Sequence, residues 1–151
     1  MKIPEPLFFI INAIMRGLLR SPLHFVVSKS VLVITYTGRK SGRKLSTPVR
    51  YIRVEGRIRC LTSQHTQWWR NVQASPNVSL LIEGSRAPFH AEIQQQDPQL
   101  TAQKIRHMLG LFPQDAPYQD IRLNADKSLN EEDLLAASHK AIVVDFQVAA
   151  E

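Results

Sequence analysis

Short runs of β-branched and aromatic residues follow one another through the middle of this sequence, and glycine turns join several of them. Each run has the length and composition of a β-strand. Glu55-Gly56 is typical of a two-residue hairpin turn, and Gly84-Ser85-Arg86 marks a second hairpin. Such hairpins, with one short helix inserted, predict a small barrel or a curved sheet. The expected strands span residues 31–36, 49–54, 57–62, 77–83 and 87–94.

The other patterns predict helices around this sheet. Residues 66–74 form a short expected helix that ends before Pro76. Asp97-Pro98 opens a helix over 99–109, which Gly110 is expected to end. Asn130 is expected to cap a helix over 131–137, with acidic residues in its first turn. The candidate buried positions of the middle helix are Leu100, Ile105, Met108 and Leu109.

The C-terminal part completes an α+β pattern. Residues 111–123 contain prolines and are expected to be irregular. Residues 141–148 predict a last strand, central or closing a barrel, because Ile142, Val143 and Val144 are consecutive apolar residues. At 151 residues the chain is expected to hold one main domain, residues 25–151, after a lead-in over 1–24.

Residues 6–20 predict an amphipathic helix in that lead-in. Leu7, Ile11, Ile14 and Leu18 fall on one face, and polar residues spaced by four fall opposite. The apolar run is too short to span a bilayer, which takes about 20 residues. Two interpretations remain, a helix packed on the core and a helix lying on a membrane surface.

The net charge of +6 and a pI near 9.8 favour an anionic partner. Nucleic acid, an acidic membrane surface and a charged cofactor are the three candidates. The charge is local, since residues 35–59 hold eight lysines or arginines and one acid, Glu55. No nucleic-acid reader motif accompanies this charge, and we expect no nucleic-acid partner.

The densest part of this charge is the loop between the first two strands, which we call the basic loop (residues 38–44). Gly38 and Gly42 bracket Arg39, Lys40 and Ser41, and two more cations follow. Free backbone N–H groups and cations in one concave loop suit a phosphate or carboxylate. The alternative is a solvated hairpin tip.

Cysteine and histidine patterns give no sign of a metal site. The single cysteine, Cys60, lies inside an expected strand and is interpreted as a buried structural thiol. The five histidines are scattered, and His65 is expected to face away from a pocket. No metal-ligand spacing, nucleophile or acid–base pair stands out.

Four motifs resemble the deazaflavin-dependent nitroreductase and quinone reductase-like family, whose members use the split β-barrel of FMN-binding, pyridoxamine-phosphate-oxidase-like proteins. Gly38-Arg39-Lys40-Ser41-Gly42 is similar to the family's signature loop, and Thr47-Pro48 follows at its spacing. The segments 68–78 and 112–120 resemble its tryptophan–asparagine and tyrosine–glutamine–aspartate regions. In register, these motifs cover residues 31 to about 144.

The resemblance implies an oxidoreductase that uses coenzyme F-420 (8-hydroxy-5-deazaflavin) to pass a hydride to a quinone, nitro compound or activated alkene. The chemistry belongs to the coenzyme, so no catalytic acid–base pair is required. Tyr118 would lie over the ring and shape the pocket or donate a proton. The implied coenzyme-binding residues are Arg39, Lys40, Ser41, Gly42, Arg43, Thr47, Pro48, Thr62, Ser63 and Trp69.

One segment departs from the family pattern. The family has Ser-Lys-Gly-Gly before its tryptophan, whereas residues 63–67 here contain neither the lysine nor the glycines. Arg43 or Arg70 would have to replace the lost phosphate contact. An FMN-binding or lipid- or fatty-acid-binding split barrel without deazaflavin activity is therefore the alternative function.

The remaining expectations concern the partners of the protein and its location in the cell. Besides the small-molecule electron acceptor, we expect a homodimer and a peripheral membrane contact through the N-terminal helix. The expected location is the cytoplasm, with association to the cytoplasmic face of the membrane.

Overall fold

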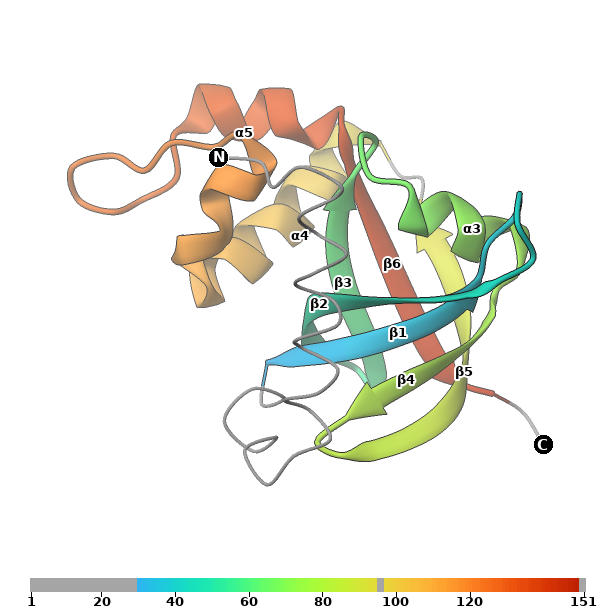
Figure 1. Ribbon diagram of the computed structural model, residues 1–151. Coiled ribbons are helices and arrows are strands. Elements are labelled where there is room, and N and C mark those ends of the chain that lie inside the picture. Colours follow the sequence, from blue (N-terminus) through green and yellow to red (C-terminus); the bar gives the residue numbers. More distant parts are fainter. Residues whose placement is uncertain (1–29, 95–96, 150–151) are drawn as a thin grey trace.

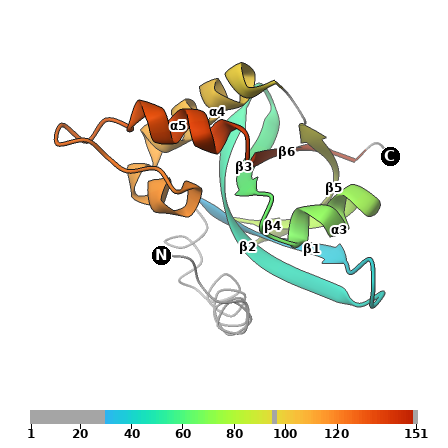
Figure 2. The ribbon, with the colours of Figure 1, turned by 90° about the horizontal axis from the view of Figure 1, so that it is seen from above.

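The structure, a computed structural model, describes residues 30–94 and 97–149 of the chain. Six antiparallel strands close into a barrel in the order β1-β2-β3-β6-β5-β4 (Figures 1 and 2). The predicted small barrel is confirmed. The strands are β1 (Val31–Thr37), β2 (Lys44–Val54), β3 (Arg57–Ser63), β4 (Asn77–Ile82), β5 (Ser85–Gln94) and β6 (Ala141–Val148).

Two of the hairpins turn on a glutamate followed by a glycine. Glu55 and Gly56 have φ angles of 50° and 79°, and Glu83 and Gly84 have φ angles of 50° and 80°. Positive φ at both central residues matches the right-handed twist of a hairpin. The first turn is where the sequence placed it. The second was expected at residues 84–86 and lies one residue earlier, so β5 begins at Ser85.

Strand β2 is longer than the sequence suggested. It begins at Lys44 rather than at residue 49, so Thr47 and Pro48 lie inside a strand and not in a loop. Pro48 lacks an N–H group, which normally excludes proline from a central strand. Here it is tolerated because β2 pairs with β1 opposite Val33 but pairs with β3 only from Tyr51 onward. One edge of β2 is therefore open beside Pro48.

Alternate residues of the strands point inward and form the main core. Cys60 is fully buried there, and burial raises the pKa of its thiol, so it stays protonated. The structural role predicted for this cysteine fits its position. Other fully buried inward residues are Leu32, Ile34, Leu80, Val144 and Phe146.

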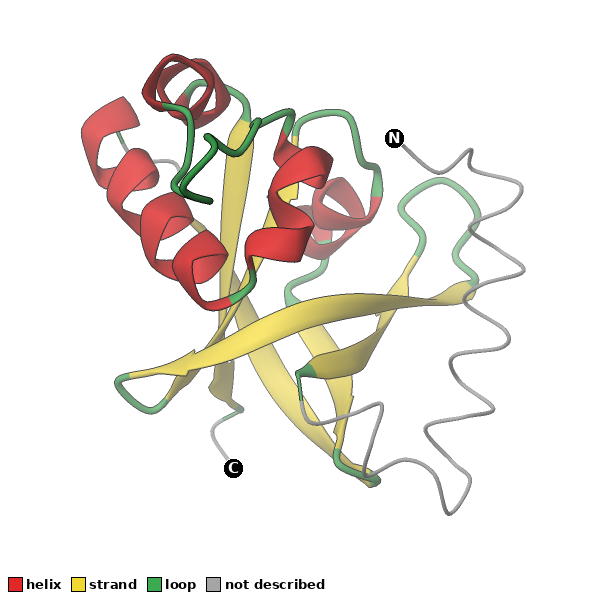
Figure 3. Cartoon of the chain, turned by 90° about the vertical axis from the view of Figure 1, so that its left-hand side faces the viewer, coloured by secondary structure: helices red, strands yellow, loops and turns green. Residues whose placement is uncertain are grey.

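Short helices gather at one end of the barrel (Figure 3). Asp97 and Asn130 cap two of them, since their side chains accept hydrogen bonds of 3.0 Å from the Leu100 and Asp133 amides. The helices are α3 (Trp68–Ala74), α4 (Pro98–Leu111), the 3₁₀ helix η1 (Pro113–Gln119) and α5 (Glu131–Ser138).

A second, smaller core joins α4, η1 and α5. Of the four positions predicted to be buried in α4, Ile105, Met108 and Leu109 are buried. The prediction for Leu100 is wrong, because this residue is 43% exposed. Gly110 does not end α4, which continues to Leu111. The second core contains Ile105, Leu109, Ala116, Ile121, Leu134 and Ala137.

The predicted N-terminal helix over residues 6–20 lies outside the described residues, as does the proposed lead-in. Among the helices within 30–94 and 97–149, none is both long and apolar enough to cross a membrane.

Candidate functional site

A cavity of about 600 Å³ opens between β1, β2 and the end of β3 on one side and α3, α4 and η1 on the other. Its walls divide by chemistry. Neutral polar residues come from β2, β3, α3 and the loop between the last two, and include Ser46, Thr47, Thr62, Ser63, Thr66, Gln67 and Asn71. The apolar residues include Val31, Leu45, Val49, Leu61, Met108, Leu109 and Phe112. A flat, partly polar molecule suits such a lining.

Two hydroxyl pairs face this cavity. The Tyr36 and Thr47 oxygens lie 3.0 Å apart, and those of Thr62 and Thr66 lie 2.7 Å apart. Burial raises the pKa of Tyr36, an effect that its hydrogen bond to Thr47 partly opposes. Tyr36 is therefore a neutral phenol at physiological pH. Both pairs offer neutral donors and acceptors to a ligand, and neither supplies a charge.

The basic loop lies at the rim of the same cavity. It closes through hydrogen bonds from the Gly38 amide to the Arg43 carbonyl (2.8 Å) and from the Gly42 amide to the Gly38 carbonyl (2.9 Å). Gly42 has a φ angle of +70°, a left-handed conformation that favours glycine. A Cβ atom on Gly38 would lie 2.8 Å from the Ser41 oxygen. The backbone conformation of Gly42 therefore favours glycine, whereas at Gly38 a larger residue would require the Ser41 side chain to move.

Arg39 connects the loop to the cavity wall. Its backbone N–H and its Nη1 both donate to Asn71 Oδ1, at 3.0 and 2.8 Å, and its Nη2 donates to Gln67 Oε1 at 3.1 Å. Asn71 and Gln67 both line the cavity. The guanidinium of Arg39 is thus fixed at the cavity rim, and Asn71 braces the loop.

An ion pair holds the opposite wall together. Arg50 on β2 donates from Nε and Nη2 to Asp115 on η1, at 2.6 and 3.2 Å, and from Nη1 to Ser30 Oγ at 2.8 Å. The guanidinium also lies 4.5 Å from the centre of the Phe112 ring. Arg50, Asp115 and Phe112 all line the cavity, so this ion pair fixes η1 against the barrel.

Tyr118 extends from η1 into this wall. It lines the cavity, and the residue is 52% exposed. Gln119, its neighbour, is buried and lines the cavity as well. The position of Tyr118 suits a residue that covers a bound ring at the mouth of the cavity.

The structure brings together only part of the predicted site. Thr47, Pro48, Thr62, Ser63 and Tyr118 line the cavity. Arg39 lies at the rim of the cavity, because it donates hydrogen bonds to Asn71, which lines the cavity. The remaining loop residues, Lys40, Ser41, Gly42 and Arg43, are exposed beside the rim and are not part of the lining.

The two adjacent tryptophans take different places. Both are buried, but Trp68 lines the large cavity, whereas Trp69 lines a separate cavity. His65, which was expected to face away, lines the large cavity. Tyr36, Arg50 and Asp115 were not predicted, because no local motif marks residues that meet only through the fold.

Acidic and metal-binding groups are sparse here. Within the described part of the chain, no group of three histidine, cysteine, aspartate or glutamate side chains lies close enough together to hold a metal ion. The acid that lines the cavity, Asp115, is occupied by Arg50.

Comparisons with known proteins fit this geometry. The family model described as "F420H(2)-dependent quinone reductase" matches residues 21–129. No curated protein matches the chain.

Solved structures share the fold. An F420-H2 dependent reductase (FDR-A) has a TM-score of 0.50 and 22% identity, covering 77% of this chain and 94% of its own. A putative pyridoxamine 5'-phosphate oxidase from Listeria innocua has a TM-score of 0.53 and 10% identity, with coverages of 93% and 91%. A structure described as a domain-swapped dimer has a TM-score of 0.51 and 20% identity, with coverages of 93% and 99%. Together with the closed barrel, these likenesses confirm the predicted split β-barrel.

Proposed function

This chain belongs to the F420H(2)-dependent quinone reductase family, and we propose that it passes a hydride from its coenzyme to a quinone, nitro compound or activated alkene. Membership makes it a deazaflavin-dependent reductase with coenzyme F-420 as its cofactor. The choice of electron acceptor and the residues of the site are the parts that we propose.

The observation that supports this function is the large cavity with the basic loop at its rim. A deazaflavin is a flat ring with carbonyl and N–H groups, joined to a tail of phosphodiester and glutamates. The ring would lie against Thr47, Pro48, Thr62 and Ser63, where neutral hydroxyls meet apolar surface. The tail would run to the loop, where Arg39, Lys40, Ser41, Gly42 and Arg43 offer cations and backbone N–H groups.

The donor set fits this coenzyme on both counts. The interior offers hydroxyl and amide groups and no unpaired charge. This suits an uncharged ring with polar edges, because no isolated ion has to lose its water when the ring binds. The rim is cationic and exposed, which suits an anionic tail that stays partly in water. Gln67 lies in the segment that lacks the family lysine. Its side-chain oxygen accepts a hydrogen bond from the Arg39 guanidinium and so orients this cation.

When bound, the reduced coenzyme supplies the hydride. The chain's own contribution is to bind, to orient and to exclude water. The Tyr36–Thr47 and Thr62–Thr66 hydroxyl pairs would fix the plane of the ring. Phe112 and Met108 would exclude water from the side on which the acceptor enters, and Arg50 with Asp115 keeps that wall in place. Tyr118 would cover the ring and offer its hydroxyl proton to the reduced acceptor.

A fluorescence titration with reduced and oxidised coenzyme tests this proposal. We expect saturable quenching below tens of micromolar, and oxidation of the reduced coenzyme when menadione, a nitroimidazole or cyclohexenone is added. Native mass spectrometry of the purified protein is the accompanying measurement. A protein that co-purifies with FMN or a fatty acid and shows no saturable deazaflavin binding would contradict the proposal and support the alternative function.

The acceptors differ in how they should use the cavity. Its apolar wall favours a quinone over a small polar nitro compound, because burial of apolar surface contributes about 25 cal/mol per Å². We therefore expect menadione to have the highest kcat/KM of the three. A similar rate for all three acceptors would show that the apolar wall does not select the substrate.

A homodimer and a cytoplasmic, membrane-associated location also remain predictions. The dimer described for one structure of the same fold supports the first of them. Light scattering is expected to give twice the 17.2 kDa mass of the chain. The membrane contact depends on residues 6–20, and vesicle flotation of the full chain against a chain without them tests it.

A further inference from the structure

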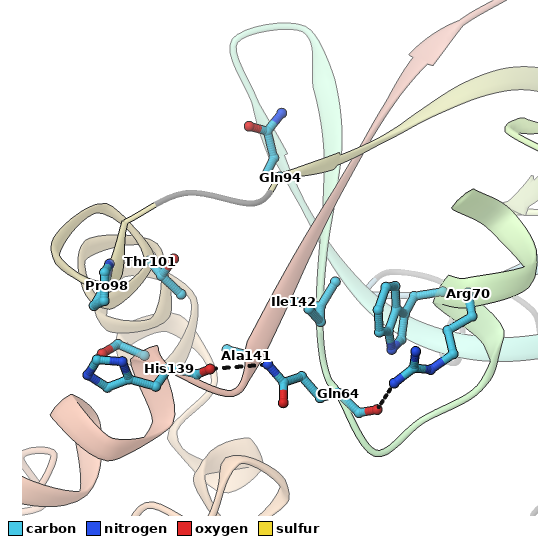
Figure 4. A pocket seen from close by; sticks show the side chains of 10 residues that line it. Gln64, Arg70, Gln94, Pro98, Thr101, His139, Ala141 and Ile142 are labelled. Atoms are coloured by element: carbon cyan, nitrogen blue, oxygen red, sulfur yellow. Dashed lines mark hydrogen bonds between the residues drawn. The ribbon is translucent and has the colours of Figure 1, made fainter. Parts of the chain in front are cut away.

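A second cavity, of about 470 Å³, lies between α3, the start of α4 and the junction of α5 with β6. Arg70 on α3 stands on one side of it, and Pro98, Thr101 and His139 stand on the other, with Gln64 between them (Figure 4). The two cavities share no lining residue. The proposed function uses only the first cavity.

The lining of this second cavity is polar and carries positive charge. Arg70 and His139 are its basic residues, and no aspartate or glutamate is among the residues that line it. Its neutral polar residues are Gln64, Gln94, Thr101 and Ser138. A hollow with an arginine and no lining acid attracts anions.

Arg70 is held in place by neutral groups. Its guanidinium lies 4.6 Å from the centre of the Trp69 ring, and its Nη2 donates to the Gln64 carbonyl at 3.2 Å. Gln64 in turn donates from Nε2 to the His139 carbonyl at 3.2 Å, which joins the two sides of the cavity (Figure 4). Stacking on an indole and one carbonyl contact position a guanidinium without neutralising it.

Trp69 itself provides an independent observation. Its side chain is 95% buried and lines this cavity, and its Nε1–H is the one buried side-chain donor without a hydrogen-bond partner in the described part of the chain. Buried donors are nearly always satisfied, because an unsatisfied one loses its bonds to water. An indole can only donate, so the missing partner must be an acceptor.

We propose that this cavity binds a small carboxylate through the Arg70 guanidinium and the Trp69 indole N–H. A carboxylate is planar and accepts two parallel hydrogen bonds from a guanidinium, and one oxygen can also accept from a neighbouring donor. One arginine matches its single negative charge. A dianionic phosphate would keep a second charge unpaired beside an apolar wall formed by Pro98, Ala141 and Ile142.

The carboxylate can come from two sources, a free small acid or the acidic end of a longer ligand that also reaches the first cavity. The probe for the first source is monomethyl glutarate, a monoanion that is called glutarate from here on. The probe for the second is the intact coenzyme, compared with a deazaflavin nucleoside that lacks the glutamate tail.

The sequence contains two tryptophans, so a ¹⁵N-labelled protein gives two indole N–H signals, which the Trp69→Phe variant assigns. We expect glutarate to move the Trp69 signal downfield in a saturable way, while the Trp68 signal stays in place. Arg70→Gln should weaken glutarate binding about tenfold or more, because a charge-assisted bond is lost. Arg53→Gln is the matched control, since Arg53 also stacks on an aromatic ring, that of Tyr51, at 5.8 Å.

The control should bind glutarate like the unchanged protein. A Trp69 signal that moves with neither glutarate nor the intact coenzyme, that moves equally in Arg70→Gln, or that responds to phosphate in place of glutarate would overturn the assignment. If only the intact coenzyme moves the signal, the carboxylate belongs to its tail. If glutarate binds equally with and without coenzyme, the occupant is a free acid. Both results support the site, and neither depends on turnover, so they stay distinct from a failure of the proposed function.

Discussion

Arg39 differs from the other cations of the basic loop, because its donors already have partners in the cavity wall. Asn71 Oδ1 accepts from both its backbone and its guanidinium, and Gln67 accepts from the same guanidinium. Lys40 and Arg43 have exposed side chains beside it. The loop therefore combines one arginine that shapes the rim with two cations that are free to follow an anionic tail.

This difference leads to a prediction for alanine variants. Lys40→Ala and Arg43→Ala should each weaken coenzyme binding roughly tenfold, through loss of a charge-assisted contact, and change the free energy of unfolding by less than about 0.5 kcal/mol. Arg39→Ala should weaken binding and also cost about 1–2 kcal/mol of stability, because Asn71 loses a donor. Urea unfolding and coenzyme titration measure both effects. Equal stability losses in all three variants would contradict the distinct role of Arg39.

For individual residues, the sequence indicated which residue types line the cavity, but it did not indicate the direction in which each side chain points. The motif that contains Trp68, Trp69 and Asn71 identified the correct helix. Neighbouring residues on a helix point about 100° apart, so the two tryptophans had to differ. Which of them faces the large cavity depends on the rotation of α3 against β1 and β5, and no local pattern encodes that rotation.

Among the elements, η1 forms one wall of the cavity, and the Arg50–Asp115 ion pair joins it to the barrel while Ala116 packs in the second core. Replacement of Asp115 by alanine leaves Arg50 half-buried without its carboxylate. We expect Asp115→Ala and Arg50→Gln to destabilise the protein, and the double variant to lose less than the sum, with a coupling of about 1 kcal/mol. Chemical unfolding of the four proteins gives this coupling. A coupling near zero would mean that η1 is held by its second-core contacts alone.

Helix α5 offers a test that depends on pH. The Arg122 side chain and backbone N–H both donate to the Asp133 carboxylate. These bonds, chiefly the one from the side chain, lower the pKa of that carboxyl below its usual 3.8. Because the pKa of this carboxyl is lower in the folded protein than in the unfolded chain, its ionisation stabilises the fold at any pH above the unfolded pKa. This stabilisation is lost as the pH falls through the folded pKa.

Arg122→Gln should therefore raise the pKa of Asp133 in an NMR titration, and it should lower stability at neutral pH but not below the folded pKa. Arg106→Gln is the control, because Arg106 pairs with Glu131 and not with Asp133. A shift of the Asp133 pKa in the control equal to that in Arg122→Gln would contradict the assignment.

The boundaries of these elements show what local sequence can give. Asn130 was identified as a cap, and Asp97-Pro98 as the opening of a helix, because these signals depend on the first turn alone. Glu55-Gly56 was identified because the turn fixes both φ angles. The start of β2 was missed, because Pro48 is tolerated only where β3 does not pair beside it. Gly110 was misassigned because α4 continues for one more residue to Leu111, and the next N–H, that of Phe112, still donates to the Met108 carbonyl.

For the whole molecule, barrel closure brings β6 between β3 and β5, and a buried ion pair marks this junction. Arg59 and Asp145 lie directly opposite each other and form two hydrogen bonds of 2.8 and 3.0 Å, with side chains 14% and 2% exposed. Asp145→Asn should destabilise the fold by about 3–5 kcal/mol, because it leaves a buried guanidinium without its countercharge.

The double variant Arg59→Met with Asp145→Leu removes both charges and should recover most of that loss. Thermal unfolding compares the two proteins. A single variant as stable as the unchanged protein would show that water reaches this pair and that it does not hold the junction.

The order of the strands explains why the overall fold was more predictable than the site. Five of the six strands belong to hairpins, so local turns determine three of the six strand pairings, namely β1–β2, β2–β3 and β4–β5. The walls of the cavity join residues as far apart as Arg50 and Asp115, and only the closed barrel brings them together.

A crystal structure of the chain with the reduced deazaflavin tests the central claim most directly. We predict the ring in the large cavity, in contact with Thr47, Pro48 and Thr62, with Tyr118 over it and the phosphodiester within hydrogen-bond distance of Arg39 or Lys40. A ring bound anywhere else, or a large cavity filled by an acyl chain while the basic loop contacts only solvent, would contradict the account.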